Sequence, residues 1–330
     1  MRRLAIAALL LAALRVDAKP IRASYQGNPE PPRTDFWRDM LEPHADEVRH
    51  ILQIASQSLQ QGDIALWGDY DPTGQGRARY YHEAYGMLRY AHRLAPENID
   101  VLRLLGQTAD ELGKTRQALD AFETAVHLVG PDKAGPEVTG RLGAIYLRLG
   151  RVDEAIRFLR YAQGPIISGK PVTAMTLVHL SNALARRGDM GDAIDVLSGS
   201  LQNNIPYPGN EVTLVGFALA VQLDRDEQRG AAFDAIDHMQ TQLTTSFAAT
   251  VQNGIAMMRF APAEDQHYYQ ALLYEVMGNY TEARAEWLLY AAGDPPFRAR
   301  ALDHVAAIDT LRRAPAPHAP HGRPVGSRVP

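Results

Sequence analysis

Four segments of the chain repeat one spacing of small and large residues, and this repetition limits the fold more than any other feature of the sequence. In each segment a glycine is followed five residues later by an alanine, and a large apolar residue comes four residues after that alanine. Antiparallel helices joined by a short turn need small side chains where their axes approach most closely. The glycine and alanine pairs are Gly113 and Ala118, Gly150 and Ala155, Gly188 and Ala193, and Gly278 and Ala283.

The same segments carry a small residue before the glycine, in the stretch expected to form the first helix. A glycine at the turn can end that helix in a left-handed conformation that other residues adopt only at a cost. One helical pair leaves an apolar face uncovered, so the pattern predicts an array of stacked hairpins. The small residues of the first helices are Gly106, Gly143, Ser181 and Ala271.

This spacing resembles that of the tetratricopeptide repeat, a helix-turn-helix unit of thirty-four residues, over most of residues 44–311. The step from Ala84 to Ala118 is 34 residues, whereas the later steps are 37, 38, 39 and 51 residues. A unit at 213–242 matches weakly, because Glu227 stands in the place of the turn glycine. The resemblance implies an all-α fold, namely a right-handed superhelical solenoid of about six repeats that ends in a C-terminal capping helix.

The two ends of the chain differ from the repeats. Residues 1–18 combine a basic start, an apolar run of eleven residues and a small residue at Ala18, which is the pattern of a cleaved signal peptide. Residues 19–34 and 314–330 are rich in proline and polar residues, so we expect an extended linker and a disordered tail. The repeats would then occupy residues 35–313 of a protein exported to the periplasm or the extracellular space, with no transmembrane segment after the signal.

The composition argues against several classes of function. The net charge is −4, close to balance, which does not suggest a nucleic-acid binder. The chain has no cysteine, and this excludes disulfides, thiolate metal sites and a cysteine nucleophile. The sequence also lacks a phosphate-binding glycine loop and a Gly-x-Ser-x-Gly nucleophile motif. We therefore expect a non-catalytic protein without a cofactor or a metal ion.

The turn of the first repeat has an unusual length. If residues 46–62 and 80–98 are its two helices, Gly62 and Ala84 lie 22 residues apart, where the other repeats have five. The spacing therefore predicts an insertion of seventeen residues, with a loop at 68–79.

Within this insertion, Asp69, Asp71 and Thr73 stand where a calcium-binding loop has its first ligands. Tyr80 occupies the position that requires a bidentate glutamate, so a simple turn is the favoured interpretation. The alternative function is a divalent-cation-regulated binding module that uses the 68–79 loop. A zinc-protease helix would need a second histidine at the position of Gly86, so His82 alone does not indicate a zinc site.

The resemblance also indicates where a partner would bind. In tetratricopeptide arrays the first helices line the concave face and commonly bind peptide segments or partner helices. We therefore expect a scaffold with a protein or peptide partner, in which Phe217 and Tyr268 act as anchors while Asn182 and Arg186 fix the register. The predicted groove face consists of Arg103, Gln107, Asp110, Arg148, Asn182, Arg186, Phe217, Tyr268, Leu272 and Glu275.

Overall fold

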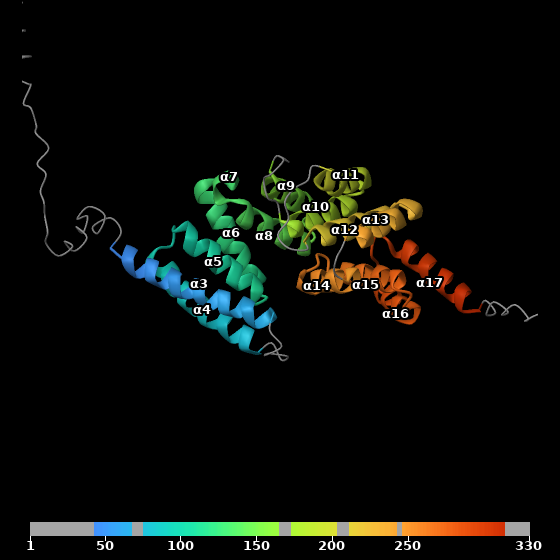
Figure 1. Cartoon of the computed structure of the whole chain (residues 1–330). Coiled ribbons are helices and arrows are strands. Elements are labelled where there is room, and N and C mark those ends of the chain that lie inside the picture. The colour runs from blue at the N-terminus through green and yellow to red at the C-terminus, as the bar shows by residue number, and fades with distance from the viewer. Residues whose placement is uncertain (1–42, 68–74, 165–172, 203–210, 243–245, 314–330) are drawn as a thin grey trace, which may run out of the picture. The chain divides into compact units, whose positions relative to one another are not determined.

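The computed structural model describes residues 43–67, 75–164, 173–202, 211–242 and 246–313, and the regular structure in these ranges is helical (Figure 1). The chain divides into two units, Met1–Ala45 and Asp46–Pro330, and the repeats belong to the second. The predicted signal peptide, the linker and the tail lie outside the described residues. None of the described helices is long and apolar enough to cross a membrane.

The helices form six successive hairpins, which confirms the repeat architecture. Each hairpin consists of two helices that follow each other in the chain. The hairpins are α3 (Ala45–Trp67) with α4 (Gln75–Leu94), α5 (Ile99–Glu111) with α6 (Thr115–Val129), α8 (Pro136–Arg148) with α9 (Val152–Gln163), α10 (Ala174–Arg187) with α11 (Met190–Gln202), α12 (Glu211–Arg225) with α13 (Arg229–Gln242), and α15 (Asp265–Val276) with α16 (Tyr280–Ala291). The remaining helices are α7 (Pro131–Ala134), α14 (Phe247–Met257) and α17 (Arg298–Arg313).

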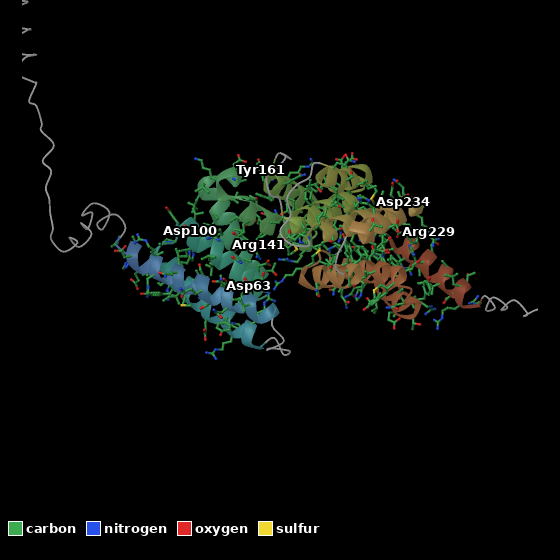
Figure 2. All side chains as sticks on the ribbon, viewed as in Figure 1. Asp63, Asp100, Arg141, Tyr161, Arg229 and Asp234 are labelled. Carbon is green, nitrogen blue, oxygen red and sulfur yellow. The ribbon has the colours of Figure 1, made fainter. Side chains whose placement is uncertain are left out.

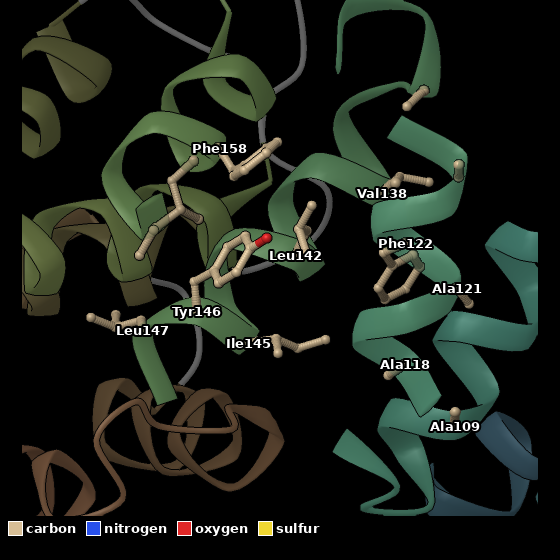
Figure 3. Packing of buried hydrophobic residues seen from close by; sticks show 14 of the residues in the cluster. Ala109, Ala118, Ala121, Phe122, Val138, Leu142, Ile145, Tyr146, Leu147 and Phe158 are labelled. Atoms are coloured by element: carbon tan, nitrogen blue, oxygen red, sulfur yellow. The ribbon is translucent and has the colours of Figure 1, made fainter. Parts of the chain in front are cut away.

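Small residues lie where the two helices of a hairpin come closest, as the spacing predicts. A Cβ atom on Gly106 would lie 2.6 Å from Phe122 Cε1, and one on Gly143 would lie 2.6 Å from Leu159 Cγ. Both large side chains are fully buried. Figure 3 shows Phe122 within the cluster of apolar side chains that fills the space between hairpins. The close approach of the helices is therefore built from the residues that define the sequence repeat.

The turns reproduce the left-handed conformation expected of the repeat glycines. Gly188 ends α10 with a φ of 99°. In the fifth hairpin Glu227 has a φ of 60°, although it has a side chain. Glu227 therefore adopts the conformation of the glycine whose place it takes, at a cost that glycine does not have.

The predicted helix boundaries of the first hairpin are wrong. Helix α3 continues through Gly62 to Trp67, and α4 already begins at Gln75. Gly62 is a packing residue rather than a turn residue, since a Cβ atom there would lie 2.7 Å from Tyr81 Cε2. The Tyr81 hydroxyl donates a hydrogen bond of 2.5 Å to Asp63, which Figure 2 labels on α3. Much of the predicted insertion is thus helical, and residues 68–74 lie outside the described part.

Helix α14 is an element that the sequence pattern did not predict. It lies in the 51-residue step before the last repeat, and it packs against α12 and α15. Val251 and Ile255 of this helix are buried, with exposed fractions of 0% and 2%. The Ser246 hydroxyl accepts a hydrogen bond from the Ala249 backbone at the start of the helix. Apolar residues at a spacing of four, after a capping serine, are the sequence feature that could have revealed it.

The last helix confirms the predicted capping role. Helix α17 packs against α16 and buries Ala301 and Ile308 completely. Arg284 of α16 and Asp309 of α17 form an ion pair at 2.7 Å across the contact. The apolar face of the sixth hairpin is therefore covered.

Candidate functional site

The predicted groove face has an accessible part and a buried part. Arg103, Gln107, Arg148, Arg186 and Glu275 are partly exposed. The five buried members expose no more than 5% of their surface, and they are Asp110, Asn182, Phe217, Tyr268 and Leu272.

The two predicted anchors lie in the core of this structure. The ring of Phe217 lies edge-on to those of Phe247 on α14 and Tyr269 on α15, with centroid distances of 6.1 Å in both pairs. The ring of Tyr268 lies 4.7 Å from that of Trp287, and its hydroxyl donates a hydrogen bond of 2.7 Å to Asp224. Phe217 is unavailable to a partner while α14 covers it, because its side chain is already in contact with the chain's own residues.

The side-chain oxygen of Asn182 is engaged inside the protein. It accepts hydrogen bonds of 2.8 Å from Gln222 and 3.1 Å from Arg225, both on α12. Arg225 in turn donates a hydrogen bond of 2.8 Å to Asp265, the first residue of α15. Asn182 thus helps to hold α10, α12 and α15 together. The same side-chain oxygen would have to serve the expected contact with a partner.

Glu275 belongs to a second polar network, which the sequence did not reveal. His304 of α17 contacts Glu275 at 2.8 Å through Nδ1 and Asp224 at 3.0 Å through Nε2. Burial alone would lower the pKa of His304, but hydrogen bonds to these two carboxylates raise it to about 8. Burial would raise the pKa of Asp224, but His304 and Arg300 hold it well below its usual range. These residues come from distant repeats, so no local spacing joins them.

A group of charged residues surrounds Asp110 and Glu111, the last two residues of α5. Arg77 of α4 donates a hydrogen bond of 3.0 Å to the Glu111 carboxylate. Arg141 of α8, which Figure 2 labels, donates another at 3.2 Å. Three neighbouring hairpins therefore contribute to one charged site.

Two arginines of α8 also contact the carboxylate of Asp110. Arg148, at the end of α8, donates a hydrogen bond to it, and Arg141 lies 3.6 Å away.

The charge of Arg148 also reaches His179 of α10. Burial, and secondarily that charge, lower the pKa of His179 to about 4, so this histidine is neutral at pH 7.

A fourth arginine comes from a distant part of the sequence. Arg259, in the segment between α14 and α15, lies 3.2 Å from the Glu111 carboxylate. Four arginines thus surround two carboxylates, and we call Arg77, Arg141, Arg148, Arg259, Asp110 and Glu111 the arginine cluster.

An open cleft adjoins the arginine cluster. Its volume is about 390 Å³, and Asp110, Arg148 and Arg259 contribute to its walls. The other lining residues are Gly113, Thr115, Met258, Phe260, Ala263 and Gln266. The cleft therefore offers hydrogen-bond donors and acceptors beside apolar atoms, which is the combination found in sites for small or extended ligands.

The other residues considered in the first hairpin do not form a site among the described residues. Asp69, Asp71 and Thr73 lie outside the described ranges, so the cation-binding loop stays a prediction. Tyr80 and His82 belong to α4. Over the described ranges, no group of three or more His, Asp or Glu residues could hold a metal ion.

Comparison with protein families identifies the repeat. The family model of the tetratricopeptide repeat matches residues 103–171. This match contains Arg103, Gln107 and Arg148 of the accessible groove face and the buried Asp110. The search for relatives among the curated proteins found no match.

Solved structures of similar topology include three whose titles name their proteins. The structure titled for the functional characterisation of Pseudomonas aeruginosa pilF has 14% identity and a TM-score of 0.48, covering 80% of this chain and 99% of that one. PilW, described as a widely conserved type IV pilus biogenesis factor, has 16% identity and a TM-score of 0.43, covering 76% and 99%. The Cut9–Hcn1 hetero-tetramer structure has 15% identity and a TM-score of 0.45, covering 80% and 47%.

Proposed function

Since this chain is a tetratricopeptide-repeat protein, we propose that it is a non-catalytic scaffold that binds a peptide or protein partner on its groove face. Proteins with this repeat generally mediate protein–protein interactions. The observation that carries the proposal is the cleft beside the arginine cluster. The cleft lies at the ends of α5 and α8, and its residues Asp110, Gly113, Thr115 and Arg148 belong to the segment that matches the family.

The accessible residues of α5 extend this site along the helix. Arg103 lies about two helical turns before Glu111 and Gln107 about one turn before it, and both are partly exposed. Arg103 forms an ion pair of 3.2 Å with Glu137 of the next hairpin. A partner that spans this row meets guanidinium and amide donors in succession, which suits the carbonyl and side-chain oxygens of an extended peptide.

The chemistry of the cleft supports binding rather than catalysis. The carboxylate of Asp110 lines the cleft, and that of Glu111 is its neighbour in the chain. Each forms an ion pair with an arginine of α8. Both carboxylates already accept hydrogen bonds from the chain's own arginines, which leaves fewer of their lone pairs for contact with a ligand.

The predicted signal peptide supports a place of action in the cell envelope or outside the cell. Cell fractionation of a strain that expresses the chain with a C-terminal epitope would test this part. We expect the mature protein, shortened by the signal peptide, in the periplasmic or extracellular fraction. A full-length chain in the cytoplasmic fraction would contradict it.

The groove is tested by quantitative crosslinking in the native envelope, followed by mass spectrometry. The test variant carries Arg103→Ala and Gln107→Ala, which remove two accessible donors. Arg116→Ala is the matched control, because Arg116 is exposed on α6, the second helix of the same hairpin. We expect the crosslinked partner to fall at least tenfold with the double variant and to persist with the control. Equal recovery from all three chains would contradict the groove assignment.

A further inference from the structure

The segment between α14 and α15 crosses to the end of α5, 148 residues earlier in the chain. Arg259 Nη1 donates a hydrogen bond to the carbonyl oxygen of Asp110. Its Nη2 donates to the carbonyl oxygen of Glu111 at 2.6 Å and to the Glu111 carboxylate at 3.2 Å. The planar guanidinium therefore binds two consecutive carbonyl groups with its two ends.

This arrangement depends on the position of the two carbonyl groups in the helix. Asp110 and Glu111 are the last residues of α5, where carbonyl oxygens lack the full set of intrahelical partners. The negative end of the helix dipole lies at the same place and favours a cation. This explains how a fourth arginine can join a cluster with only two carboxylates.

The site distinguishes arginine from lysine. A guanidinium is a flat fork of fixed donors and can reach both carbonyl oxygens at once, whereas an ammonium group is a point charge. The side chain of Arg259 is 39% exposed, so its site is open to solvent and accessible from outside.

The residues that follow Arg259 pack against the apolar core. Phe260 is 5% exposed, and its ring lies 5.0 Å from that of Tyr269, which in turn contacts Phe217. Ala261 is fully buried and belongs to the apolar cluster that the first four hairpins form. Arg259 and Phe260 thus make the two kinds of contact that an extended peptide would make: a charged fork at a helix end and an apolar side chain packed on an aromatic ring.

We propose that the end of α5 is a recognition site for an arginine followed by a large apolar residue, and that the chain's own Arg259 and Phe260 occupy it in this state. A partner peptide of the same chemistry displaces them. This inference rests on the proposed scaffold function. The chain's own residues 258–262 would compete with the partner and so regulate the partner's access to the end of α5. The observed affinity for the partner is then reduced by the fraction of chains in which residues 258–262 fill the site.

The test uses the chain from residue 19 onward and a fluorescent peptide, acetyl-MRFAPA-amide, which copies residues 258–263. Its binding is followed by fluorescence anisotropy to wild type, to Arg259→Ala and to Arg259→Ala with Phe260→Ala. We expect the Arg259→Ala chain to bind at least tenfold more tightly than wild type, because its own segment competes less well. A peptide with lysine in place of arginine should bind that variant at least tenfold more weakly.

Three results decide the proposal. Equal Kd values for wild type and Arg259→Ala would overturn it, and so would an absence of binding to every chain at about 1 mM peptide, the millimolar limit of weak association. Equal binding of the arginine and lysine peptides would overturn the recognition of the guanidinium. Circular dichroism and thermal melting establish that each variant is folded. If Phe260→Ala unfolds the chain, the comparison with Arg259→Ala alone suffices.

Failure of this proposal differs from failure of the scaffold function. If the Arg103→Ala and Gln107→Ala variant loses its crosslinked partner while Arg259→Ala leaves peptide binding unchanged, the groove binds a partner of other chemistry. If neither change has an effect, the groove face itself is wrongly assigned.

Discussion

Arg225 of α12 and Asp265 of α15 form an ion pair at 2.8 Å from which water is almost completely excluded. Their side chains expose 1% and 5% of their surface. The guanidinium carbon of Arg225 also lies 4.6 Å from the centre of the Tyr268 ring and 4.7 Å from that of Phe297. The pair therefore fixes the start of α15 to the fifth hairpin within an aromatic enclosure.

Replacing one partner of this pair should be costly. Asp265→Asn leaves the charge of Arg225 buried without its counterion, so we expect a loss of about 3–5 kcal/mol in the free energy of unfolding. Urea denaturation monitored by circular dichroism would measure it. The double variant with Arg225→Met should be less destabilised than the sum of the two single changes. Strict additivity of the two losses would show that the pair is not coupled.

Two glycine substitutions, Gly106→Ala and Gly86→Ala, should have opposite effects on the stability of the protein. Gly106→Ala places a methyl group 2.6 Å from a buried ring, so we expect a destabilisation of about 1–3 kcal/mol. Gly86→Ala is the matched control, because a Cβ atom on this helical glycine meets nothing within 4 Å. That change should stabilise the protein by up to about 1 kcal/mol through helix propensity. Thermal melting of both variants provides the measurement, and effects of equal sign would contradict the packing of the hairpin.

Glu227 offers a route to a more stable chain. Its φ of 60° is unfavourable for a residue with a side chain, so Glu227→Gly should raise the free energy of unfolding by about 1 kcal/mol. Glu227→Ala keeps a Cβ atom at the same backbone angle and serves as the control. Calorimetric melting should separate the two variants by several degrees. An equal response would mean that the turn carries no strain.

His304 makes the attachment of α17 dependent on pH. Its pKa is raised to about 8 in the folded protein, against about 6.5 for a free histidine. Because the folded state binds the proton more tightly, this stabilisation is fully present below pH 6.5 and disappears as the pH rises through 8. We expect wild type to lose about 2 kcal/mol of stability over that interval.

The corresponding measurement is urea denaturation between pH 6 and 9, compared with His304→Gln. Asp224 and Glu275 face the imidazole, Arg300 donates a hydrogen bond to Asp224, and the Trp287 ring stacks on the imidazole with a centroid distance of 4.4 Å. The variant cannot take up the proton, so its stability should vary less over this range. Parallel curves for the two proteins would assign the pH dependence to other groups.

The sequence alone determined the repeat, because the repeat depends on contacts between residues that are near one another in the chain. A glycine that ends a helix, an alanine five residues later and a bulky residue such as Phe122 are all required within one hairpin. Their spacing therefore appears directly in the sequence, and the six hairpins and the capping helix follow from it. Gly62 misled the boundary prediction because glycine serves both turns and close packing, and only the position of Tyr81 distinguishes the two.

The tertiary structure alone decided which part of the groove face is open. Counting from the repeat correctly placed Phe217 and Asp110 on first helices, but it could not show that α14 covers Phe217. The contact of Arg259 with the end of α5 joins residues 148 positions apart, and no local periodicity records such a pairing. Burial depends on what the rest of the chain brings to a surface, so the accessible part of the site was fixed only when the whole chain had folded.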